Sequence, residues 1–192
     1  MNDEKVAFEI QLWRLSELGF GFVDGCSPDD LLVGMAKDDY ECEPYWLVMT
    51  EMGGEADKEG VDHLSDDVAY LDSECIYGPE DYIAFVQRVA TIARRVVGIS
   101  DIEVRMPPGS SHAEIDFVAG GTRYGGKVPV REDWLAEEAL ELLGRAIRKH
   151  GAGSRLLVGQ GGGQDFMLCV GDLRLRSALQ ELTGPMWKWH AQ

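Results

Sequence analysis

The side chains best able to do chemistry in this sequence are carboxylates crowded into the stretch from Asp38 to Asp81, in which Lys58 is the only basic residue. Carboxylates this close repel one another unless they spread over a solvated surface or meet a positive partner. The stretch therefore predicts a surface that attracts cations or basic proteins. The residues that we expect to contact such a partner are Asp38, Asp39, Tyr40, Glu41, Glu43, Asp62, Asp66, Asp67, Asp72, Glu74 and Tyr77.

One part of this stretch imitates a calcium-binding loop. Glu55, Asp57 and Glu59-Gly60, with Asp66 at the end, follow the acid-x-acid-x-acid-Gly spacing. The first position should be Asp and the last a bidentate Glu, and neither condition is met. A solvated acidic loop is the favoured interpretation, and whether residues 55–66 bind calcium is left open. We expect no metal site and no cofactor.

Paired carboxylates and histidines could serve acid–base catalysis. Asp72 and Glu74 share one face if residues 68–76 form a strand, as the acid and base of a glycosidase would require. Nothing resembling an aromatic sugar platform accompanies them, so an exposed strand face is favoured. His63 lies among acids, which would raise its pKa and allow a pH-sensitive position, although an ordinary surface histidine is the favoured interpretation. No set of base, nucleophile and oxyanion donor can be assembled, so we expect no catalytic residue and no enzyme.

A glycine-rich run over residues 159–164 could suggest a phosphate-binding loop. Such a loop needs a Gly-Lys-Ser/Thr sequence that opens a helix. Here the pattern of a strand follows instead, so we expect a hairpin turn.

Length and charge limit the class of protein. The chain has 192 residues, 45% of them hydrophobic, and a net charge of −16. That is enough for one domain over residues 1–192, which could divide into an acidic lobe (1–98) and a near-neutral lobe (99–192) sharing a core. Residues 1–82 hold 22 acidic and 4 basic residues, whereas residues 83–192 hold 12 and 14. A surface of this charge should reject nucleic acid and anionic membranes.

The expected cellular location is based on three features: membrane-spanning segments, a signal peptide and the cysteines. No apolar run approaches the roughly 20 residues needed to span a bilayer, and the acidic N-terminus lacks the apolar core of a signal peptide. The cysteines Cys26, Cys42, Cys75 and Cys169 form no CxxC pair. Reduced, mostly buried thiols in a cytoplasmic protein are the expected outcome.

Hydrophobic periodicity predicts an α+β protein. We expect helices over residues 3–18, 79–97, 132–149 and 173–182. We expect strands over residues 45–50, 68–76, 102–106, 113–119, 123–130, 155–158 and 166–170. Units of two strands and a helix would cover 45–97, 113–149 and 155–182. They predict an antiparallel or mixed sheet built from hairpin–helix units, with helices packed on one face. The tail containing Trp187 and Trp189 should cover an edge strand.

The sequence Tyr70-Leu-Asp-Ser-Glu-Cys-Ile-Tyr-Gly-Pro-Glu-Asp-Tyr82, with the later acid-capped helix and the closing Leu182-Thr183-Gly184, resembles small cytosolic proteins encoded beside bacterial polymorphic toxins. These are immunity proteins. The resemblance implies a non-enzymatic inhibitor that binds one cognate toxin and blocks its active site. Acidic residues would steer the encounter with a basic toxin, and aromatic residues would supply affinity.

Two other function classes stay open at this point. The first is a different acidic binding module, either a nucleic-acid mimic or an adaptor for another basic protein. The second is an uncharacterised enzyme that uses carboxylates and a divalent metal. The oligomeric state and the identity of the toxin are not readable from the residues.

Overall fold

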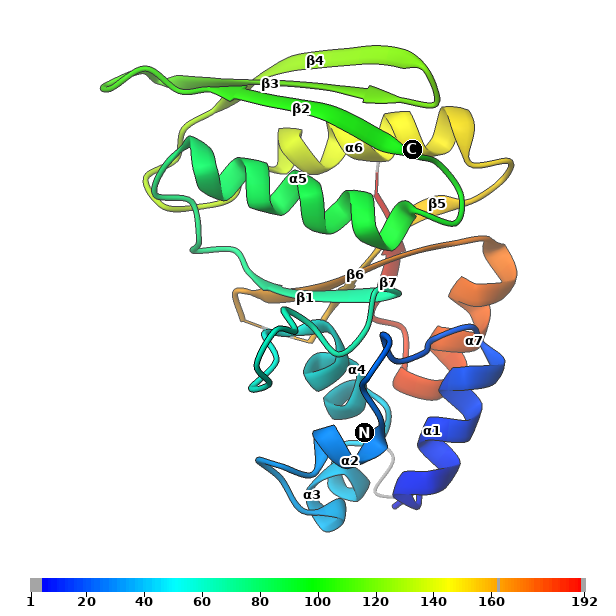
Figure 1. Ribbon diagram of the computed structural model, residues 1–192. Helices are drawn as coiled ribbons and strands as arrows, with labels where there is room; N and C mark the ends of the chain where they lie inside the picture. Colours follow the sequence, from blue (N-terminus) through cyan, green and yellow to red (C-terminus); the bar gives the residue numbers. More distant parts are fainter. Residues whose placement is uncertain (1–4, 162, 191–192) are drawn as a thin grey trace.

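The computed structural model describes residues 5–161 and 163–190. Figure 1 shows its layers: a three-stranded sheet at the top, two helices beneath it, a four-stranded sheet across the middle and further helices below. The helices are α1 (Phe8–Glu17), α2 (Pro28–Leu31), α3 (Lys37–Cys42), α4 (Trp46–Gly53), α5 (Pro79–Ala93), α6 (Glu137–His150) and α7 (Leu173–Thr183). The strands are β1 (Val68–Asp72), β2 (Ile99–Arg105), β3 (His112–Ala119), β4 (Thr122–Pro129), β5 (Arg155–Gln160), β6 (Asp165–Gly171) and β7 (Trp187–Trp189).

The four-stranded sheet separates two hydrophobic cores. Its order is β1-β6-β5-β7, and every pair is antiparallel. Successive side chains of a strand point to opposite faces. Val68 therefore belongs to a lower core with Phe8, Tyr40 and Trp187, whereas Ala69 belongs to an upper core with α5, α6 and β3. Both faces of this sheet are covered.

The three-stranded sheet has the order β2-β3-β4 and is covered on one face. Along β3, Ile115 and Phe117 are buried against the helices beneath. The alternating Glu114 and Asp116 face outward and pair with Arg105. The predicted α+β class with antiparallel sheets is confirmed. Packing of helices on a single face describes this sheet, while the four-stranded sheet has helices on both sides (Figure 1).

The strand expected over residues 45–50 is wrong, because this segment lies in helix α4. The run is short and apolar, and such a run does not distinguish a strand from a buried helix. Val48, Met49 and Met52 fill the lower core from one side of the helix. A strand would have sent alternate side chains away from that core.

The expected unit of a hairpin followed by a helix is present in two of the three predicted segments. The hairpins β3–β4 and β5–β6 precede α6 and α7 as expected. Over residues 45–97 there is no hairpin, because β1 pairs with β6. The helix expected to open at Glu132 begins at Glu137 instead, since Glu132 has a left-handed φ of 56° that an α-helix does not accommodate.

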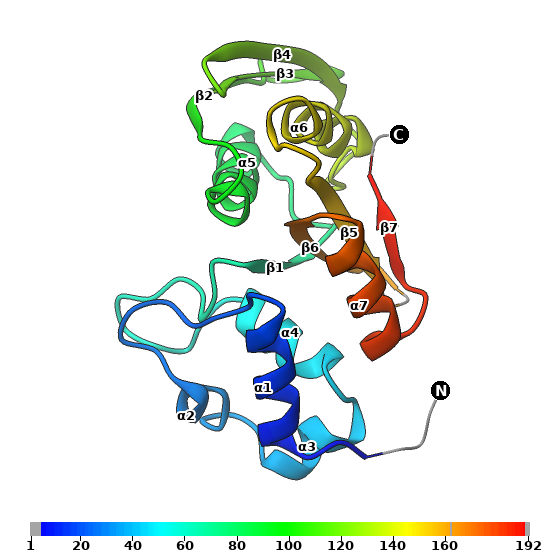
Figure 2. The ribbon, with the colours of Figure 1, turned by 90° about the vertical axis from the view of Figure 1, so that its right-hand side faces the viewer.

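The two ends of the described chain both contribute to the lower core. The helix expected over 3–18 is α1, which begins at Phe8; residues 3 and 4 lie outside the described part. Trp13 is 61% exposed because only one side of α1 meets the core. The tail forms β7, which covers the edge of β5 as predicted (Figure 2).

Candidate partner-binding surface

Helix α3 presents the first group of expected contact residues. Asp38, Asp39 and Glu43 are exposed, while Glu41 is half-buried and accepts a hydrogen bond from the backbone N–H of Phe8. Tyr40 is fully buried, and its hydroxyl donates to the carbonyl oxygen of Leu31 over 2.5 Å. Tyr40 is therefore a core residue and not a surface contact, because the turn of α3 directs its ring toward Phe8 in the lower core.

The second group lies on residues 54–67, which we call the acidic loop. Lys58 ties this loop to the neighbourhood of α2: its Nζ donates to the carbonyl oxygen of Gly25 and to Asp30, each over 2.7 Å. Glu55, Asp57, Glu59 and Asp62 remain exposed. The single cation of the acidic stretch is thus used to hold the loop in place.

Arg88 of α5 anchors the acidic loop from beneath. Its side chain is buried, and its Nη2 donates to the carbonyl oxygens of Gly53, Ser65 and Val68. Burial disfavours the charged guanidinium and lowers the pKa of Arg88 to about 10, against the attraction of Asp66. The two ends of the loop therefore meet at one guanidinium.

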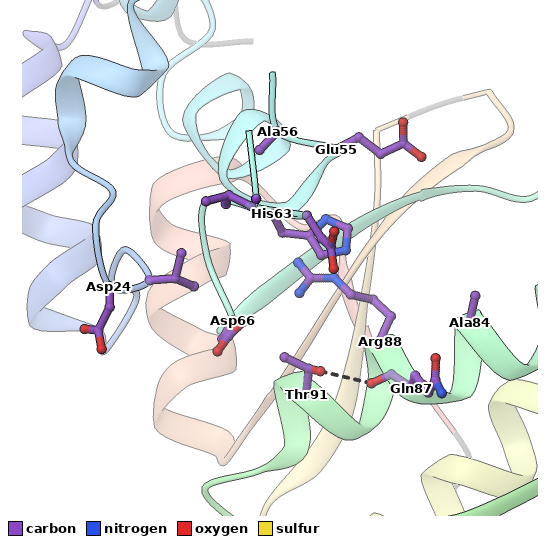
Figure 3. Close-up of a pocket in the computed structure, with 13 residues that line it drawn as sticks. Asp24, Glu55, Ala56, His63, Asp66, Ala84, Gln87, Arg88 and Thr91 are labelled. Carbon is purple, nitrogen blue, oxygen red and sulfur yellow. Dashed lines mark hydrogen bonds between the residues drawn. The ribbon is translucent and has the colours of Figure 1, made fainter. Parts of the chain in front are cut away.

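A hollow of about 660 Å³ lies between the acidic loop and α5 (Figure 3). The acidic residues Asp24, Glu55, Asp62 and Asp66 are among those that line it. His63 also lines it, with Nδ1 2.8 Å from the carbonyl oxygen of Gly54. The pKa of His63 is lowered, first by burial, so the expectation of a raised pKa is wrong: desolvation outweighs the attraction of the surrounding acids.

The carboxylate of Asp67 forms contacts within the protein and is therefore not free to bind a partner. Its carboxylate lies 3.1 Å from Arg94 Nη2 and 3.2 Å from Arg95 Nη2, and it accepts a hydrogen bond from the backbone N–H of Gly21. Asp66 lies 3.6 Å from Arg94 Nε. These two acids therefore fix the end of the acidic loop.

A third group gathers where several loops meet at one end of the four-stranded sheet. Asp72, Glu74 and Tyr77 lie here with Gln164 and Trp134, and we call these five residues the sheet-end platform. Sequence reasoning identified the first three and missed the other two. Trp134 was assigned to the start of a helix and Gln164 to a hairpin turn, and neither pattern carries a signal of contact with residues 72–77.

The expected contact residues therefore form three separate groups on α3, on the acidic loop and on the sheet-end platform. Within residues 5–161 and 163–190, no three His, Cys, Asp or Glu side chains are placed to hold a metal ion, residues 55–66 included. The cysteines are unpaired thiols; Cys42 is exposed and only Cys169 is buried, so the expectation of mostly buried thiols is wrong. No helix in the described part is long and apolar enough to cross a bilayer.

Comparisons of the chain with protein-family models, with curated proteins and with solved structures find no match.

Proposed function

We propose that this protein is an immunity protein, which binds a cognate basic bacterial toxin through its acidic surface and neutralises it. The observation that carries the proposal is the lack of internal cations. Across the described residues, the only acids between Asp38 and Asp81 that form ion pairs are Asp66 and Asp67. In the described part of the chain, the other carboxylates have no basic side chain as partner, and those that are exposed, such as Asp38, Glu43 and Asp62, keep their charge available for an external partner.

The acidic surface is also held in a defined shape. Lys58 joins the acidic loop to the region of α2, and Arg88 fixes both ends of the loop. A surface ordered before binding loses less conformational entropy when a partner arrives. Uncompensated charge of one sign accelerates encounter with an oppositely charged partner by factors of about 10 to 1,000 at low salt.

The proposal expects a gene beside this chain's gene to encode a basic toxin domain, and the test is neutralisation of that domain. That domain is expressed in cells with and without this chain, and growth is followed. The proposal expects growth to be rescued, and association of the purified proteins to slow as salt is raised. A toxin that stays active when this chain is present in excess would overturn the proposal.

Charge-reversal variants show whether the acidic surface is responsible. Asp38, Glu43 and Asp62 are exposed and their side chains form no hydrogen bond or ion pair in the described structure, so changing all three to Lys should preserve the fold. The association rate with the toxin domain should fall about tenfold or more. A matched control changes Glu132, Glu141 and Glu181 to Lys, with the same change in net charge on the near-neutral half. Equal effects from both triple variants would mean that net charge, not this surface, governs binding.

A further inference from the structure

The sheet-end platform joins three loops that are distant in sequence. The carbonyl oxygen of Gln164 accepts hydrogen bonds from the backbone N–H of Ser73 over 3.2 Å and from its hydroxyl over 2.7 Å. Leu135 N–H donates to the carbonyl oxygen of Ser73 over 2.7 Å, and Ile76 N–H donates to the backbone carbonyl oxygen of Asp133 over 2.8 Å. Figure 1 shows the β1–α5, β4–α6 and β5–β6 connections together at the left end of the sheet. These bonds fix the backbone beneath the platform.

Two large aromatic side chains remain at the surface of this fixed backbone. Tyr77 is 75% exposed and Trp134 is 40% exposed. Tyr77 Oη lies 3.4 Å from the carbonyl oxygen of Glu74, to which it donates, and Glu74 pairs with Trp134 through the backbone. Tyr77 and Trp134 are therefore both held next to the backbone of Glu74, Tyr77 by its hydroxyl and Trp134 by its own backbone. Exposed Tyr and Trp on a rigid support are the residue types that dominate binding energy at protein interfaces.

The carboxylates of Asp72 and Glu74 are not neutralised by a basic side chain of the described structure. Gln164 Nε2 donates to both oxygens of Asp72 over 3.1 Å and to Glu74 over 3.3 Å. In the described structure, neither carboxylate forms an ion pair with a Lys, Arg or His. The neutral amide of Gln164 thus contacts two negative groups on the same short segment that carries Tyr77 and pairs with Trp134.

We propose that the sheet-end platform is the point at which the partner protein inserts an arginine. The guanidinium would donate to Asp72 and Glu74 and place its flat face on Tyr77 or Trp134. Arginine fits better than lysine because its planar fork satisfies two carboxylates while it stacks on a ring. This inference rests on the proposed function, which supplies the basic partner protein. It adds the site at which that partner is bound.

The first test uses a peptide probe and needs no toxin. The full chain, labelled with ¹⁵N, is titrated with the acetylated and amidated peptide Gly-Arg-Gly-Arg-Gly, and separately with its lysine counterpart. The inference expects shifts concentrated at the Trp134 indole N–H, the Gln164 side-chain amide and the Tyr77 amide, with the arginine peptide binding more tightly. Shifts spread evenly over α3 and the acidic loop, or equal binding of the lysine peptide, would overturn it.

Variants then separate the rings from the charges. Tyr77→Ala should weaken arginine-peptide binding about threefold or more, and Asp72→Asn with Glu74→Gln should weaken it further. The matched control is Trp13→Ala, which removes an exposed ring from α1 and should change binding little. Because Tyr77 is mostly exposed, its variant should melt like the parent protein. A Tyr77→Ala variant that melts normally and binds normally would overturn the inference.

The two proposals can fail separately. If the arginine peptide binds at the platform but the toxin domain is not neutralised, the proposed function fails and the arginine site stands. If the toxin is neutralised equally well by Tyr77→Ala and by Asp72→Asn with Glu74→Gln, the platform inference fails and the proposed function stands.

Discussion

The guanidinium of Arg88 in α5 donates a hydrogen bond to the carbonyl oxygen of Gly53, 3.2 Å away at the end of α4. The same Nη2 also reaches the carbonyl oxygen of Val68, the first residue of β1. One buried side chain therefore closes the base of the acidic loop. Three carbonyl acceptors on Nη2 and the nearby negative field of the loop offset part of the cost of burying this charge, whereas Nε and Nη1 are buried without a hydrogen-bond partner in the described structure.

Replacing Arg88 with Ala should lower the free energy of unfolding by about 2–4 kcal/mol, because three backbone carbonyls lose a charged donor in a buried setting. Urea unfolding measures this loss, and hydrogen exchange should show faster opening at the base of the acidic loop. The control is Arg145→Ala, at an exposed position of α6, which should change stability by less than about 0.5 kcal/mol. Equal losses of unfolding free energy in both variants would show that Arg88 does not anchor the acidic loop.

Gly53→Ala should destabilise the protein by about 1–3 kcal/mol, although Ala is the better helix former. A Cβ at this position would lie 2.8 Å from the backbone nitrogen of Tyr70 and 3.0 Å from the carbonyl carbon of Ala69, and backbone atoms of a strand cannot move aside cheaply. At Gly98 a Cβ would meet nothing within 4 Å. Gly98→Ala should therefore be neutral or slightly stabilising in the same thermal melts, and a stabilised Gly53→Ala would show that α4 and β1 are not in close contact.

Acidification should weaken the fold through His63. Burial holds the pKa of His63 below the unfolded value of 6.5, so the unfolded chain takes up a proton more readily than the folded one. The contribution of the neutral imidazole is complete above pH 6.5 and is lost as the pH falls below it. Urea unfolding at about pH 7.5 and pH 5.5 should show a larger decrease for the parent protein than for His63→Gln. A His63 pKa above 6.5 in an NMR titration would contradict the expectation.

Trp187→Ala should cost about 3–5 kcal/mol, as expected for removing a buried aromatic side chain. Trp187 is fully buried, and its indole Nε1 donates to Thr183 Oγ1 over 3.0 Å. Trp13→Ala removes the same side chain from an exposed position and should change stability by no more than about 0.5 kcal/mol. Calorimetric melts of the two variants compare them directly; similar melting temperatures would mean that β7 contributes little to the lower core.

Local signals in the sequence predicted the elements whose ends are set by nearby residues. The last helix was expected over residues 173–182, and just before it the carboxylate of Asp172 accepts from the backbone N–H groups of Arg174 and Leu175. The strands expected over 113–119 and 123–130 leave a turn at Gly120-Gly121, and both glycines have positive φ there. In such cases the chemistry that forms the element lies within a few residues.

The misses share a dependence on distant contacts. Residues 45–50 belong to a helix that packs closely against β1 at Gly53, and no local pattern shows this contact. Trp134 and Gln164 reach the sheet-end platform through pairings with residues 73 and 74, far away along the chain. Asp72, Glu74 and Tyr77 could be grouped in advance only because they are neighbours in sequence.

The place of Trp187 in the lower core has a consequence for protein synthesis. This core also contains Phe8, Leu15 and Tyr40, which a ribosome makes first. At about 5–20 residues per second, roughly 10–40 seconds pass before Trp187 is added. During that interval the nascent N-terminal segment carries apolar side chains whose final partner does not yet exist. The lower core is therefore completed only when residues 187–189 have been made, long after its first apolar residues.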